Sequence, residues 1–215
     1  TTAATVNTMH LNPNSMVLAG GTLAWGGTTS IWGSWNLDHD ITVTENSTIS
    51  AAYMTITQSG GTAFNVATGK TLTVSGTIIS TTEASGCVCD SNALKINNAA
   101  GYTGTVILSG TNTYKGVTTV SRGTLRVSNS SGLGGTTSGT TVATGAALEL
   151  THASGITIGA EALTLNSDGI SSGGALRNIS GNNTYGGLIT QASASRINSD
   201  AGTLTLDATT GNAIT

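Results

Sequence analysis

Short stretches of alternating or continuous apolar residues follow one another along the whole chain, and each ends in a cluster of Gly, Asn, Ser or Thr. A period of two places every second side chain on the same face of a strand. The best candidate for a helix, residues 160–163, is too short to be stable. The pattern therefore predicts many short β-strands, among them residues 41–44, 54–57, 71–74, 105–108, 124–127, 148–150, 156–158, 163–165 and 204–206.

Internal repetition decides among the all-β architectures. The stretch LSGTNTYKG at residues 108–116 recurs as ISGNNTYGG at residues 179–187, about 71 residues later, which is about three turns of 23 residues. A second unit, a small residue followed by Leu, places Leu125 and Leu148 about 23 residues apart. This repetition predicts a parallel β-helix of roughly ten coils, a rod about 45–50 Å long.

The composition agrees with this prediction. The 215 residues include 30 Gly and one Pro, and 8% of them are charged, although 37% are hydrophobic. Amphipathic helices normally carry a charged solvent face, and disordered chains are poor in apolar residues, so both classes are excluded. A formal net charge of -3 gives no basic surface for nucleic acid, and no apolar stretch is long enough to cross a bilayer as a helix.

No linker divides the sequence. We therefore expect residues 1–215 to form one β-helical segment with a less regular start in residues 1–50. Both ends look like cuts within a longer protein, so we expect the segment to be part of a longer exported chain.

Residues 108–150 resemble the passenger-associated repeat of bacterial autotransporters. In that repeat, a G-x-N-T-Y-x-G-x-T-x-V stretch leads to G-T-L, then to a Leu-Gly turn and then to G-A-x-L-x-L. A less complete copy covers residues 179–206, and residues 61–78 resemble a variant of it. The landmark positions in the two copies are Gly110, Asn112, Tyr114, Gly123, Leu125, Leu148, Gly181, Asn183, Tyr185 and Leu204.

The resemblance implies a right-handed parallel β-helix on the outer surface of a Gram-negative bacterium or secreted from it. It implies no particular activity, because such passengers carry adhesins, proteases, esterases or no identifiable function. It also implies tolerance of closely spaced cysteines. Cys87 and Cys89 then form either a strained disulfide that clips their loop or two reduced thiols, and a zinc site would need further ligands.

Two groups of residues are candidates for ligand binding. Asp38 and Asp40 would share one face of an extended strand, as carboxylates must to hold a cation or flank a glycosidic bond, or they belong to a solvated turn. Trp25, Trp32 and Trp35 either stack on sugar rings or cover the end of the core.

Catalysis finds no support in the sequence. A Gly-x-Ser-x-Gly elbow is missing, the acids are scattered, and neither Arg122 nor Arg126 has an evident acidic partner. We expect no catalytic residue, no metal site and no cofactor.

The leading hypothesis is a structural or adhesive segment of an exported surface protein. It would contact a host or neighbouring-cell surface, an extracellular glycan or copies of itself. The alternatives are a self-assembling filament subunit, a β-helix enzyme that acts on polysaccharide, and a flat surface with Thr-x-Thr arrays that binds ice.

Overall fold

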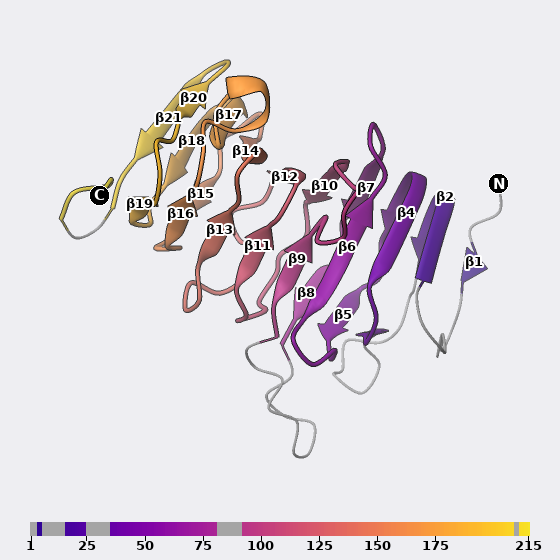
Figure 1. Cartoon of the computed structure of the whole chain (residues 1–215). Coiled ribbons are helices and arrows are strands. Elements are labelled where there is room, and N and C mark those ends of the chain that lie inside the picture. Colours follow the sequence, from indigo (N-terminus) through magenta and orange to yellow (C-terminus); the bar gives the residue numbers. More distant parts are fainter. Residues whose placement is uncertain (1–3, 6–15, 25–34, 81–91, 209–210) are drawn as a thin grey trace.

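The chain is wound into coils of parallel strands, and the computed structural model describes residues 4–5, 16–24, 35–80, 92–208 and 211–215. Successive coils are stacked along one axis, so the first and last described strands lie at opposite ends of the stack (Figure 1). This arrangement is the predicted all-β parallel β-helix. In the described part of the chain, the one helical element is a single 3₁₀ turn, η3 (Ile170–Ser172).

Each complete coil has three sides, which we call faces A, B and C. On face A the first halves of β2 and β4 are followed by β6, β9, β11, β13, β16 and β19, each paired in parallel with the next. Their bounds are β2 (Met16–Ala24), β4 (Ile41–Ile49), β6 (Thr62–Val66), β9 (Leu94–Ile96), β11 (Thr118–Val120), β13 (Thr140–Val142), β16 (Leu163–Leu165) and β19 (Ile189–Gln191).

Face B is continuous with face A because β2 and β4 extend around the corner between them. Its strands run in parallel from one end of the stack to the other. The first is β1 (Ala4–Thr5), followed by the second halves of β2 and β4. The strands that follow are β7 (Thr71–Val74), β10 (Thr105–Leu108), β12 (Gly123–Val127), β14 (Ala146–Thr151), β17 (Leu176–Ser180) and β20 (Ile197–Ser199).

Face C consists of two three-stranded sheets joined by non-strand segments. Backbone hydrogen bonds from Thr113 to Ile78, from Asn112 to Ser131 and from Gly135 to Tyr114 continue the stack between them. The strands are β3 (Trp35–Leu37), β5 (Tyr53–Ile56), β8 (Thr77–Ile79), β15 (Thr157–Ile158), β18 (Asn182–Tyr185) and β21 (Thr203–Leu206).

The stack has about seven turns, fewer than the ten that the sequence predicts. Among the described residues, eight strands follow one another along face A, so seven steps of about 4.8 Å give a rise of about 34 Å. The prediction is too high because some coils are longer than 23 residues. The paired residues Leu72 and Val106 are 34 positions apart, and Leu148 and Leu176 are 28 positions apart.

The core is built from columns of side chains that repeat once per coil. In one column on face B, Leu72, Val106, Leu125, Leu148 and Leu176 are paired in register and are fully buried. The period of two in the sequence therefore points one set of residues inward, and parallel pairing stacks that set along the axis.

Truncation of one residue in this column tests the importance of the stack. Leu148→Ala is expected to lower the free energy of unfolding by about 2–5 kcal/mol, because it leaves a cavity between Leu125 and Leu176. Leu188→Ala is the matched control, since 42% of Leu188 is exposed, and it is expected to cost less than about 1 kcal/mol. Urea unfolding followed by circular dichroism measures both, and equal losses would contradict the stacked core.

Candidate functional site

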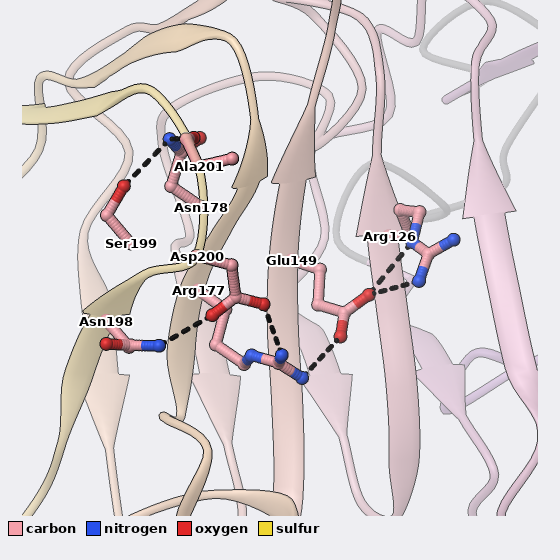
Figure 2. A network of polar contacts seen from close by, with 8 residues as sticks. All are labelled: Arg126, Glu149, Arg177, Asn178, Asn198, Ser199, Asp200 and Ala201. Atoms are coloured by element: carbon pink, nitrogen blue, oxygen red, sulfur yellow. Dashed lines mark hydrogen bonds and ion pairs between the residues drawn. The ribbon is translucent and has the colours of Figure 1, made fainter.

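A ladder of charged residues crosses four successive coils on the outside of face B (Figure 2). Arg126, Glu149 and Arg177 are paired in register on β12, β14 and β17. Arg126 donates from Nε to Glu149 Oε2 at 2.8 Å, and Arg177 donates from Nη1 to Glu149 Oε1 at 3.2 Å. Arg177 also binds Asp200 through Nη2, so the charges alternate in sign along the axis.

The ladder satisfies its own charges. The Glu149 side chain is 5% exposed, and each of its oxygens accepts from a different arginine. A carboxylate held in this way is stabilised by charge-assisted hydrogen bonds. The arrangement therefore links successive coils through ion pairs.

This ladder corrects the sequence analysis, which left Arg126 without an acidic partner. The signal was present, because Arg126 and Glu149 are separated by the same number of residues as Leu125 and Leu148. Arg122 does lack an acidic partner in the recorded contacts, and it donates instead to the backbone oxygens of Asn97 and Asn98.

The candidate acids Asp38 and Asp40 have separate partners. Asp38 Oδ1 lies 2.9 Å from His39 Nδ1, whereas Asp40 Oδ1 accepts from the backbone N–H of Ala63 in the next coil at 2.9 Å. Asp40 therefore holds two coils together. The two carboxylates do not form a paired site.

Trp35 lies on β3 in register with Met54 and packs, half-buried, against the edge of the core. It lines a shallow pocket that also includes Asp38 and His39. Trp25, Trp32, Cys87 and Cys89 lie outside the described residues.

The asparagines of the repeat landmarks bridge neighbouring coils. Asn112 Oδ1 accepts from the backbone N–H of Ile78 at 2.9 Å, and its Nδ2 donates to the backbone oxygen of Gly132 at 2.7 Å. Asn183, the equivalent residue, accepts from the N–H of Ile156 at 2.8 Å. These buried amides satisfy backbone groups of the neighbouring coils that would otherwise lack a partner.

The landmark glycines lie where two coils approach too closely for a side chain. A Cβ at Gly110 would lie 2.0 Å from the backbone oxygen of Gly76, and one at Gly181 would lie 2.0 Å from that of His152. Gly123 has a φ of 62°, and a Cβ there would lie 2.5 Å from the backbone oxygen of Gly104. Glycine is therefore required sterically at these corners.

The remaining landmarks belong to the interior. Tyr114 and Tyr185 are both fully buried, and Leu125 and Leu148 belong to the face B column. Leu204 lies on β21 in register with Asn183 and is partly buried against the core.

A polar cluster inside the β-helix was not foreseen from the sequence. Glu161 is 2% exposed, and its Oε1 accepts from Thr140 Oγ1 at 2.9 Å. Tyr114 OH lies 2.8 Å from Thr118 Oγ1, in the strand that pairs with that of Thr140. Glu161 Oε2 and Tyr185 OH are buried and make no hydrogen bond with the described residues.

Burial governs the protonation of this cluster. It raises the pKa of Glu161 to about 7, and the hydrogen bond from Thr140 opposes this effect. Burial also raises the pKa of Tyr114 and Tyr185 above the usual value, and the nearby Glu161 carboxyl adds to both shifts. Both phenols are therefore neutral at physiological pH.

Within the described ranges, no group of three or more His, Cys, Asp or Glu side chains is placed to hold a metal ion. The same part of the chain contains no helix that is both long and apolar enough to cross a membrane.

Residues 102–127, which contain β10, β11 and β12, match the family model of the passenger-associated-transport-repeat. The chain therefore carries a passenger repeat. This confirms the resemblance found in the sequence, and it fits the parallel β-helix. Passenger repeats are structural elements of surface or secreted proteins, and the segment is autotransporter-passenger-like. No curated protein and no solved structure matches the chain significantly.

A glycine of the passenger repeat provides a steric test. Gly110→Ala is expected to lower the free energy of unfolding by about 2 kcal/mol or more, because the new Cβ meets the backbone of Gly76. Gly159→Ala is the control, since its Cβ would make an ordinary contact at 3.6 Å with Thr136. Urea unfolding of the two variants should separate them, and an unchanged midpoint for Gly110→Ala would contradict the close approach.

The charged ladder provides an electrostatic test. Glu149→Ala is expected to lower the free energy of unfolding by about 2–4 kcal/mol, because two partly buried arginines lose their shared acceptor. Glu45→Ala removes the exposed pair with Lys70 and is expected to cost less than about 1 kcal/mol. Thermal unfolding by calorimetry compares the two variants, and a loss for Glu149→Ala no larger than that for Glu45→Ala would argue against the ladder.

Proposed function

We propose that the chain is a non-catalytic structural and adhesive segment of an exported protein on the outer surface of a Gram-negative bacterium. The match of residues 102–127 to the passenger repeat, within a stack of parallel coils that continues on both sides of it, supports this proposal. The segment acts as a rigid stalk whose outer faces contact a host or neighbouring-cell surface or its glycans.

The charge distribution supports a structural role. The acids and arginines that lie on successive coils of face B neutralise one another across the ladder. A glycoside hydrolase needs two carboxyl groups placed on either side of a scissile bond. Asp38 and Asp40 bind His39 and the backbone of Ala63, respectively, and thus have structural partners.

Labelling of intact cells tests the location. An epitope inserted at the exposed turn at Ser59 and Gly60 of the protein, in its bacterium of origin, is expected to bind antibody without permeabilisation. A periplasmic protein in the same cells is the control for leakage. Labelling that appears only after lysis would contradict surface exposure.

Adhesion and catalysis are tested with the purified chain. Beads coated with it are expected to bind target cells or immobilised glycans more than beads coated with a chain of equal charge, and to leave the glycans intact. Absence of binding would contradict the adhesive role. Polysaccharide cleavage that is lost in Asp38→Asn or Asp40→Asn would contradict the non-catalytic assignment.

A further inference from the structure

The corner between faces C and A has an unusual occupant. Strand pairing aligns Thr118, Thr140, Leu163 and Ile189, and the residues two positions before Thr118, Leu163 and Ile189 are Gly116, Glu161 and Gly187. At Gly187, an added Cβ would lie 1.7 Å from the backbone oxygen of Glu161, so these two corners are stacked directly on each other. Glu161 therefore brings a carboxyl group to a corner position that the repeat copies fill with glycine.

The surroundings of this carboxyl are neutral. Thr140 of β13 donates to Oε1, whereas Oε2 is buried without a hydrogen-bond partner among the described residues. The strands β16 and β19 contribute Leu163 and Ile189, which are apolar and buried. Its titratable neighbours are Tyr114 and Tyr185, both of whose pKa values it raises. Glu161 forms no ion pair with the described residues.

A negative charge in this position has little to stabilise it. One hydroxyl donor compensates one oxygen, and the other oxygen has lost its hydration without replacement. A proton on the carboxyl removes this uncompensated charge and turns one oxygen into an O–H donor. The Tyr185 hydroxyl, whose pKa the Glu161 carboxyl raises, is likewise buried without a hydrogen-bond partner among the described residues.

We propose that Glu161, enclosed by Tyr114, Tyr185 and Thr140, is an internal proton-binding site that makes the stacking of the coils at residues 156–191 depend on pH. With the proton bound, the corner packs against Gly187 and the adjacent strands stay paired. Loss of the proton leaves an uncompensated charge inside the β-helix, and the coils relax to admit water.

The direction of the pH dependence follows from linkage. The pKa of Glu161 is about 7 in the folded chain and lies near 4.5 when the residue is exposed. Between these two values the folded state binds a proton that the unfolded state has lost, so stability falls as the pH rises. The stabilising effect is complete below about pH 4.5 and is lost above about pH 7.

Urea unfolding of the full chain between pH 5 and pH 8 tests the proposal. The unfolding equilibrium constant is expected to rise about 10- to 100-fold over this range. Glu161→Gln, which is neutral at every pH, is expected to remove this rise. The control Glu45→Gln replaces an exposed carboxyl and is expected to leave the rise of the unfolding equilibrium constant unchanged. A rise that persists in Glu161→Gln would overturn the proposal.

A second pair of variants keeps the test decisive if Glu161→Gln does not fold. Thr140→Val removes the hydrogen bond that favours the carboxylate of Glu161. The pH at which the loss of stability is half complete is therefore expected to move upward. The matched control Thr164→Val lies on the outer side of β16 and is expected to leave this pH unchanged. If this pH is the same in Thr140→Val and Thr164→Val, the result would contradict proton binding at Glu161.

Hydrogen exchange locates the effect. After correction for the intrinsic pH dependence of exchange, the amides of β16 and β19 are expected to exchange faster at pH 8 than at pH 6, while those of β10 are unchanged. Exchange that changes equally in all three strands would contradict a local site at Glu161.

Discussion

The hydrogen bonds between the backbones of successive coils are the constraint on which the rest of this structure depends. Parallel pairing fixes the distance between coils at about 4.8 Å. The residues at each corner must therefore fit within this spacing without pushing the neighbouring coils apart. Gly110 and Gly181 meet this requirement by leaving out a side chain, because a Cβ at either would lie 2.0 Å from the coil below. Asn112 and Asn183 meet it by supplying a side-chain acceptor for a backbone N–H of the neighbouring coil. The passenger repeat is thus a set of residues that close corners at this fixed spacing.

The same constraint explains how a chain with 8% charged residues forms a stable interior and surface. Backbone groups of the strands are paired along the axis with the neighbouring coils, so the strands need no charged side chains to satisfy them. The charges that are present follow the axis as well. Arg126, Glu149 and Arg177 are register partners on face B, and Asp200, two positions after the register partner of Arg177, extends their alternating charges into a chain of ion pairs. Side chains on the outer face therefore reinforce the register that the backbone sets.

The repeat period made the architecture predictable, because the spacing of Leu125 and Leu148 is the length of one coil. The same spacing relates Arg126 to Glu149, so the sequence predicts this ion pair from the coil length alone. The number of coils was overestimated because some coils are longer than 23 residues, as between the paired residues Leu72 and Val106 and between Leu148 and Leu176. The cluster at Glu161 could not be predicted from the repeat spacing. Its partners come from β13 and β18 and from the corner at residue 114, and no single period connects those positions.

A solenoid responds to a local defect differently from a globular domain. Each coil contacts its two neighbours, so the stability of the rod is close to a sum of coil and interface contributions. A charge at Glu161 acts on the interfaces between β13, β16 and β19, whereas the column from Leu72 to Leu125 keeps its own contacts. The ion pairs from Arg126 to Asp200 cross the same coils on face B and hold them in register while the opposite corner relaxes. The external ladder and the internal carboxyl therefore act on the same coils in opposite directions. Because the ladder needs no proton while the corner does, raising the pH loosens one side of the rod without releasing the other.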